Sequence, residues 1–139
     1  MGYKTIGPVS GRRAIQALTA DTALTVEDSG KMFLLDAVGE DITIPAAAAA
    51  NKGVTYKFVM NAKCITSDWS MASAAADIHA IIIAGGAAEA ALISAGSADT
   101  SVRFELNNAD EGDWCEWTST GTFWIVTGGV HALANCTVA

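Results

Sequence analysis

Apolar and polar residues alternate along many short stretches of this chain, and the clearest alternation runs over 54–61. There, Val54, Tyr56, Phe58 and Met60 occupy every second position. A period of two places these side chains on one face of an extended strand, so it predicts a β-strand with one buried face. About nine to eleven such stretches, separated by turn residues, predict an all-β fold of the sandwich or barrel type. The other candidates are 13–19, 22–26, 31–36, 41–44, 69–72, 77–83, 102–107, 133–138 and two runs within 112–129.

The segment 112–129 predicts a β-hairpin around which the rest of the chain packs. It contains three of the four tryptophans, and two runs rich in aromatic and β-branched residues flank a short polar segment with Gly121. Successive residues of a strand point to opposite faces, so Trp114 and Trp117 lie on different sides of the hairpin. Because both faces carry large apolar groups, we expect a second sheet on one side and a loop or a neighbouring subunit on the other.

Only one stretch favours a helix, and it is short. Pro45 is suited to a first helical position, five alanines follow, and Gly53 can end the helix. We therefore expect at most one short helix, over 45–52, which caps an open end of the sandwich. The stretch 87–93 fits either a helix by composition or a strand by its neighbours.

Glycine and proline are dense in the first residues, which predicts an extended N-terminal arm over 1–13 before a single domain over 14–139. The net charge of −7 is unevenly placed: residues 1–20 contain three basic residues and no acid, and residues 21–139 contain five basic and fifteen acidic residues. An acidic body argues against nucleic-acid binding. The stretch 78–93 is interrupted by polar residues and glycines and does not fit a membrane span, and the N-terminus lacks the apolar run of a secretory signal.

Cysteine and histidine, which are frequent in catalytic and metal-binding sites, show no spacing in this sequence that is typical of such a site. Cys64, Cys115 and Cys136 are far apart and odd in number, so we expect buried free thiols in a reducing compartment, with one disulfide and one free thiol as the alternative. His79 and His131 have no partner at catalytic or zinc-site spacing, and a core or interface role is favoured for His79. We therefore expect neither an enzyme nor a cofactor.

An oxygen-rich cluster precedes the hairpin. Calcium prefers oxygen ligands, but the spacing does not follow the EF-hand pattern, so a solvated turn is favoured over a calcium site and no metal is expected. The cluster is Asn107, Asn108, Asp110, Glu111 and Asp113.

The large aromatic residues are candidates for packing in the core or between subunits, because each buries a large apolar area. The alternative is that exposed tryptophans stack on sugars. The candidates are Phe33, Tyr56, Phe58, Trp69, Trp114, Trp117 and Trp124.

The order of these motifs resembles a small β-domain of tailed-bacteriophage virion proteins. The resemblance covers roughly residues 18–128 and rests on a strand, an Asp-Ser-Gly-Lys turn at 28–31, an apolar strand, a strand ending at Pro45, a long aromatic strand and a closing Gly-Asp-Trp hairpin. The matching segments are 24–37, 41–46, 53–59, 112–114 and 121–128. The middle segment, 72–97, does not follow the pattern.

The resemblance implies a capsid decoration (cement) protein, or a related fibre domain, that is jelly-roll-like and trimeric and that is made in the host cytoplasm and placed on the capsid surface. The implied partners are the major capsid protein and further copies of the chain. On this reading the basic arm contacts acidic capsid patches, with Lys4, Pro8, Arg12 and Arg13 as candidate contact residues. The alternative function is a fibre or spike domain that binds host-surface glycans.

Overall fold

The computed structural model describes residues 13–86, 91–94 and 99–139. Most of the arm, including Lys4, Pro8 and Arg12, and part of the ambiguous stretch 87–93 lie outside these ranges. The described residues form twelve strands. They are β1 (Ile15–Leu18), β2 (Thr22–Ala23), β3 (Met32–Leu35), β4 (Asp41–Ile44), β5 (Thr55–Met60), β6 (Trp69–Ser73), β7 (Ile78–Ala84), β8 (Ala91–Ser94), β9 (Ser101–Phe104), β10 (Trp114–Ser119), β11 (Trp124–Val130) and β12 (Cys136–Val138).

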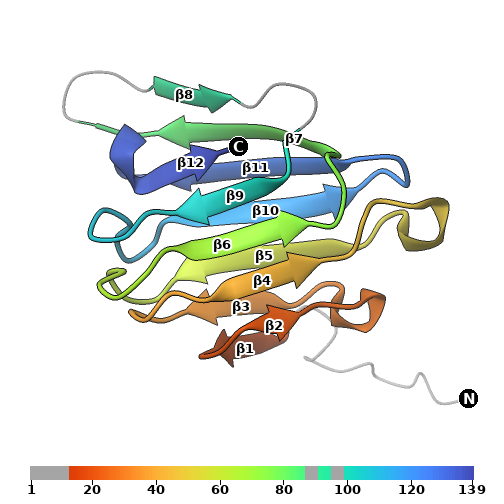
Figure 1. Cartoon of the computed structure of the whole chain (residues 1–139), viewed down its shortest axis with the longest axis horizontal. Helices are drawn as coiled ribbons and strands as arrows, with labels where there is room; N and C mark the ends of the chain where they lie inside the picture. Colours follow the sequence, from red (N-terminus) through yellow and green to blue (C-terminus); the bar gives the residue numbers. More distant parts are fainter. Residues whose placement is uncertain (1–12, 87–90, 95–98) are drawn as a thin grey trace, which may run out of the picture.

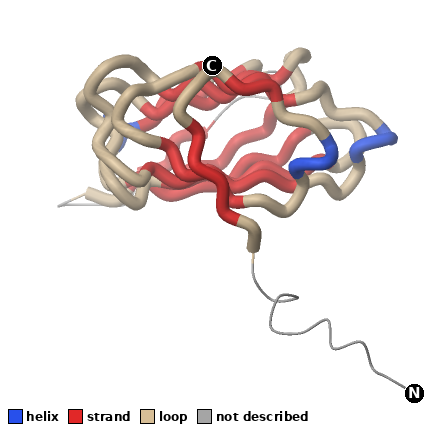
Figure 2. Tube along the Cα trace, turned by 90° about the horizontal axis from the view of Figure 1, so that it is seen from below, coloured by secondary structure: helices blue, strands red, loops and turns tan. Residues whose placement is uncertain are grey.

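The strands form two sheets that pack face to face, so the prediction of an all-β sandwich is confirmed (Figures 1 and 2). The larger sheet has seven strands in the order β1-β3-β5-β10-β11-β7-β8, and the smaller sheet has five in the order β12-β9-β6-β4-β2. Along β3 to β7, β10 and β11, buried residues alternate with exposed or half-buried ones, as in a sheet with one face on the core.

The first half of the chain winds alternately through the two sheets. Strands β1, β3 and β5 are parallel neighbours in the larger sheet, and β2, β4 and β6 are parallel neighbours in the smaller one. The second half closes the sandwich differently. The β10–β11 hairpin pairs antiparallel with β5 on one side and parallel with β7 on the other. The hairpin therefore joins the two halves of the larger sheet.

The core between the sheets is mainly aromatic and aliphatic, and most polar groups of its large rings bond to the backbone, whereas the buried indole N–H of Trp117 has no hydrogen-bond partner among the described residues. The Tyr56 hydroxyl donates to the Thr25 carbonyl at 2.8 Å, the Trp69 indole N–H to the Asp36 carbonyl at 2.9 Å, and that of Trp124 to the Pro45 carbonyl at 2.9 Å. Burying each ring contributes about 1.5–3 kcal/mol, and these bonds avoid the cost of leaving a polar atom unpaired.

The predicted helix over 45–52 is wrong. Only one turn of 3₁₀ helix forms, η2 (Ala49–Asn51), and Ala48 before it is extended. Side-chain bonds override the helical preference of the alanines: Asn51 accepts the Ala48 N–H at 2.9 Å and donates to the Ala46 carbonyl at 2.7 Å. Two other 3₁₀ turns, η1 (Val26–Asp28) and η3 (Leu133–Asn135), complete the helical content of the described residues. No helix in those residues is long and apolar enough to cross a membrane.

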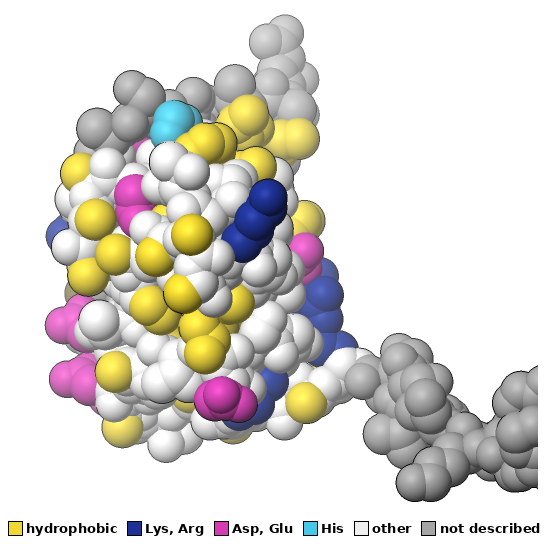
Figure 3. All heavy atoms as spheres, turned by 90° about the vertical axis from the view of Figure 1, so that its right-hand side faces the viewer, with side chains coloured by type: hydrophobic (Ala, Val, Ile, Leu, Met, Phe, Trp, Pro, Cys, Tyr) yellow, Lys and Arg dark blue, Asp and Glu magenta, His cyan; other side chains and the backbone are white. Residues whose placement is uncertain are grey.

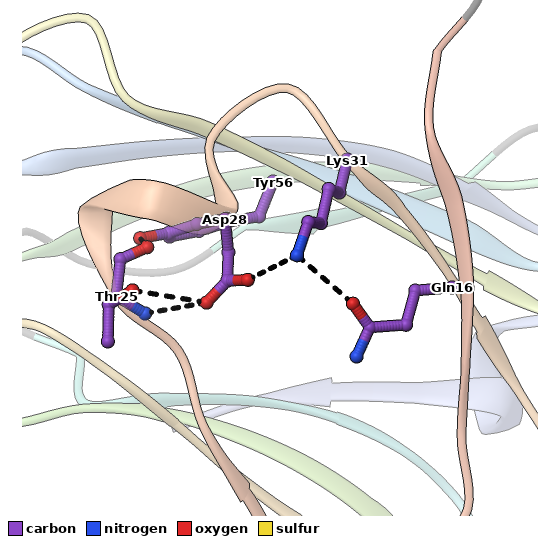
Figure 4. Close-up of polar contacts among 5 residues, drawn as sticks. All are labelled: Gln16, Thr25, Asp28, Lys31 and Tyr56. Atoms are coloured by element: carbon purple, nitrogen blue, oxygen red, sulfur yellow. Dashed lines mark hydrogen bonds and ion pairs between the residues drawn. The ribbon is translucent and has the colours of Figure 1, made fainter.

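A polar cluster at η1 ties the edge strand β1 to the interior of the larger sheet (Figure 4). Asp28 accepts hydrogen bonds from the backbone N–H of Thr25 at 3.0 Å and from the ammonium of Lys31 at 2.6 Å. Lys31 also donates to Gln16 on β1 at 3.2 Å. The expected Asp-Ser-Gly-Lys turn at 28–31 is thus present, and Gly30 adopts a φ of +84° that glycine accommodates without strain.

Several strand bounds differ from the predicted ones. The strand predicted to reach residue 107 ends at Phe104, because the backbone N–H of Leu106 turns to the carboxylate of Asp68 at 2.7 Å. The ambiguous stretch is a strand over 91–94. The last strand, predicted from residue 133, begins only at Cys136, after η3, and lies at the edge of the smaller sheet.

Candidate functional site

The seven-stranded sheet has one face that nothing in the described chain covers. This outer face consists of the side chains that point away from the smaller sheet. Ile81, Ile83 and Ile125 are exposed there by 56%, 54% and 42%. Large apolar side chains usually avoid water, so a cluster of this kind marks an interaction surface. Its members are Ile15, Ala17, Met32, Leu34, Thr55, Lys57, Val59, His79, Ile81, Ile83, Trp114, Glu116, Thr118, Ile125 and Thr127.

The strand register orders the outer face into rows that run across the strands. One row is apolar from end to end and consists of Ile83, Gly129, Trp114, Val59, Leu34 and Ala17. The next row is apolar at its ends and polar in its middle, with Ile81, Thr127, Glu116, Lys57, Met32 and Ile15. The apolar row therefore has Trp114 near its centre.

Charges are distributed unequally between the two faces of the sandwich. On the outer face Glu116 is the one acid among the described residues, and Arg13 forms an ion pair with it at 2.9 Å. The smaller sheet instead carries an acidic depression lined by Asp21, Glu40, Asp41 and Asp68, with Arg103 beside them. A hydrogen bond with Asp21 raises the pKa of Glu40, and burial and the charges of Asp21, Asp36 and Asp41 add to this effect.

Figure 3 views the sandwich edge-on and shows this difference between the two faces. Most Lys and Arg side chains in view lie towards its right-hand side, whereas Asp and Glu occupy its left-hand edge and also lie near the top, at the bottom and at the right-hand edge. The uncovered apolar face is thus also the less acidic side of an acidic protein, and an acidic partner can approach it with little repulsion.

An open hollow of about 420 Å³ lies where β7 and β11 end and β10 begins. Its walls come from the apolar row and from the turns beside it. They are formed by Gly85, Gly86, Gly112, Asp113, Trp114, Gly129, Val130 and His131. Half of these residues are glycines, so much of the wall is backbone.

A buried carboxylate fixes the orientation of the histidine in this hollow. Asp113 is fully buried, and its Oδ1 accepts hydrogen bonds from the backbone N–H of His131 at 2.8 Å and from Nδ1 of the same ring. Its Oδ2 accepts the backbone N–H of Asp110 at 3.0 Å and the side-chain amide of Asn135 at 2.8 Å. The His131 side chain is 61% exposed. In the neutral ring, a proton on Nδ1 leaves the Nε2 lone pair available to a ligand.

The indole of Trp114 forms the second functional wall of the hollow. It lies against Gly129 on β11, and the ammonium of Lys57 lies 4.7 Å from the centre of its ring. This cation–π contact is worth about 0.5–1 kcal/mol at an exposed site. Lys57 has no ion pair among the described residues. Lys57 does not line the hollow itself, but it places a cation that is available to an anion beside the Trp114 wall.

The structure separates the predicted aromatic residues into two groups. Trp114 is half-buried on the outer face, outside the core, and remains a candidate for contact with another molecule. The other six are fully buried in the core. They are Phe33, Tyr56, Phe58, Trp69, Trp117 and Trp124.

Of the four predicted arm residues, Arg13 is within the described ranges, and it pairs with Glu116 on the outer face. His79 lies on the outer face beside Phe123, with ring centres 4.4 Å apart, and not in the core. Lys57 and Gly129 were missed as site residues. The three isoleucines at 81–83, with apolar residues on both faces of one strand, were the signal for an outer contact surface.

The cysteines and the oxygen-rich cluster of residues 107–113 contribute to packing and to hydrogen bonding within the protein. All three cysteines are buried and free. In the cluster, the carboxylate of Asp113 is saturated by hydrogen bonds, and Asp110 pairs with Lys63 at 3.6 Å. Within the described ranges, no group of three or more His, Cys, Asp or Glu side chains is arranged to hold a metal ion.

Comparison with protein-family models, curated proteins and solved structures finds no match to this chain.

Proposed function

We propose that this chain is a structural protein of a tailed-bacteriophage particle, a capsid decoration protein that binds and stabilises the shell of the major capsid protein. The observation that carries the proposal is the outer face of the larger sheet, with large apolar side chains that the described chain does not cover. The motif order of residues 18–128 supplies the identity of the partner, by resemblance. The outer face of the described residues is a surface suited to adhesion, which supports a structural role.

The size of the outer face indicates that one copy binds weakly. Six neighbouring strands about 4.8 Å apart, each about 13–23 Å long, give a flat area of about 400–500 Å². A standard interface takes about 800 Å² from each partner. The arm over 1–13 and association into trimers would add the missing area, and many copies on one shell would multiply a small individual affinity.

The test uses shells assembled from the major capsid protein of the same virus. The full chain is expected to co-sediment with the shells and to raise the temperature at which they break open. Replacing Ile81 and Ile125 with lysine removes apolar contact from the outer face without disturbing the core, so it should abolish binding. Ile65→Lys is the matched control, because Ile65 is 62% exposed but lies in the β5–β6 connection, off the outer face.

A second pair of measurements examines the arm and the oligomer. A chain that lacks residues 1–12 retains all the described strands, so we expect it to fold and to lose most of its binding to shells. Analytical ultracentrifugation of the full chain should report a trimer. A full chain that leaves shells unbound and unstabilised at saturating concentration would refute the decoration role.

A further inference from the structure

We propose that the hollow between Trp114 and His131 binds a saccharide that carries a carboxylate, such as a uronic acid residue of a bacterial surface polysaccharide. The hollow adjoins the outer face, because Trp114 and Gly129 belong to both and Gly129 lies beside Ile83. Saccharide binding can be measured on the protein alone, so the inference does not depend on capsid binding. It rests on the size of the hollow, on the side chains of Trp114 and His131 that wall it and on the cation of Lys57 beside Trp114.

The size and openness of the hollow suit a sugar ring with hydroxyl groups around it. A volume of about 420 Å³ lies within the range of about 300–1,000 Å³ that is typical of small-ligand sites. Because Gly85, Gly86, Gly112 and Gly129 add no side chains, a ligand can approach the backbone closely. The hollow is open, so part of the ligand remains in water, as suits one unit of a longer chain.

The walls supply complementary chemistry for a pyranose. Trp114 is the one tryptophan that is not buried, and an indole face packs against the C–H groups of a sugar ring through dispersion. Its N–H forms no hydrogen bond to another described residue and is available as a donor. Across the hollow, Asp113 fixes the ring of His131 so that Nε2 can accept a hydroxyl proton.

Lys57 selects for negative charge. Without a ligand, its ammonium lies 4.7 Å from the centre of the Trp114 ring and has no ion pair among the described residues. A neutral sugar that stacks on the indole would displace this cation and gain nothing from it. A sugar with a carboxylate would instead form a charge-assisted hydrogen bond with it.

The indole N–H signals in a ¹H–¹⁵N NMR spectrum of the full chain give a direct test. Trigalacturonate is the probe and maltotriose the uncharged comparison, and Trp114→Phe identifies the signal of Trp114. Trigalacturonate should shift this signal saturably, with a dissociation constant on the order of 1 mM, as suits a single open site. The signals of the three buried tryptophans should stay in place, and maltotriose should bind at least 10-fold more weakly.

Variants assign the effect to the proposed groups. Lys57→Met and His131→Ala should each weaken trigalacturonate binding about 5–10-fold. Two matched controls should bind like the unaltered protein: Lys52→Met removes a lysine that lies beside Gly121, at the opposite end of the β10–β11 hairpin from Trp114, and Phe123→Ala removes an aromatic residue beside His79. An unshifted Trp114 signal at 20 mM trigalacturonate, or equal binding of maltotriose, would overturn the proposal.

Discussion

Trp114 and Gly129 face each other across the β10–β11 pair, and the indole occupies the space that a side chain on residue 129 would need. A Cβ atom placed on Gly129 would lie 3.0 Å from Nε1 of Trp114. The absence of a side chain on Gly129 therefore lets the indole of Trp114 pack directly on the backbone of β11. It determines how the ring lies on the outer face and where the wall of the hollow stands.

Gly129→Ala is expected to displace the indole and to lower the free energy of unfolding by about 1–2 kcal/mol, as for other overpacked sites. Denaturant unfolding followed by tryptophan fluorescence measures the change. Gly86→Ala is the matched control, because a Cβ on Gly86 meets no atom within 4 Å, and it should leave stability within about 0.5 kcal/mol. Equal stability of the two variants would contradict the seating of Trp114 on Gly129.

Asp113 is expected to be one of the most sensitive polar positions in the protein. Asp113→Ala leaves the backbone N–H groups of Asp110 and His131 and the amide of Asn135 without their acceptor. We expect a loss of about 2–4 kcal/mol in the free energy of unfolding, since buried donors are costly to leave unpaired. Asp110→Ala, which removes only a half-exposed ion pair with Lys63, should cost less than about 1 kcal/mol in the same measurement.

Asp28 should make stability depend on pH in the acid range. Burial alone would raise the pKa of Asp28, but hydrogen bonds from Lys31 and Thr25 and the charge of Lys31 outweigh it and lower the pKa below its ordinary value. Because the pKa is lower in the folded state, this contribution is complete above the unfolded pKa of about 3.9 and is lost as pH falls through the folded value.

Urea unfolding between pH 2 and 7 measures this contribution. Asp28→Asn should lower stability at pH 7 and flatten the acid side of the profile. The neighbouring variant Glu27→Gln serves as the control, because the Glu27 side chain forms no hydrogen bond with another described residue, and it should keep the original slope. A profile of Asp28→Asn parallel to that of the unaltered protein would rule out this contribution of Asp28.

The cysteines are expected to be inert in the folded protein. Burial raises the pKa of Cys136 to about 12, and it also raises the pKa values of Cys64 and Cys115. The reactive thiolate is therefore scarce at pH 8. Mass spectrometry after iodoacetamide treatment should find no modified cysteine in the native protein and three in guanidinium chloride. Rapid labelling of Cys64 or Cys115 under native conditions would show that the core opens easily.

The strands and their faces were largely predictable, because apolar side chains at every second position leave few choices of register. Tyr56 and Phe58 on β5, and Trp117 on β10, point inward as the alternation indicates. The helix predicted over 45–52 does not form, because even the high helix propensity of alanine contributes little free energy, whereas the side chain of Asn51 forms specific bonds to the backbone of Ala46 and Ala48.

The candidate site was less predictable, because it depends on which strands become neighbours. Lys57 and Gly129 are far apart in the chain, and both contact Trp114 only because β10 lies between β5 and β11. Period-two patterns show which side of a strand a residue occupies, but they do not order the strands in a sheet. For the same reason, the pairing of Asp113 with His131 was not foreseen.

The alternate winding of β1 to β6 through the two sheets has a consequence for how such a molecule can vary. One strand from the larger sheet and the next strand from the smaller sheet form one winding of the chain. Each such winding packs on the following one, and parallel hydrogen bonds within the two sheets hold the windings together. Adding or removing a whole winding would change how far the two sheets extend across the strands, and it would leave the thickness of the sandwich unaltered. The end of the domain formed by β1 and β2 can therefore be lengthened, shortened or fused to another parallel β-structure, while the hollow between β7, β10 and β11 keeps its shape.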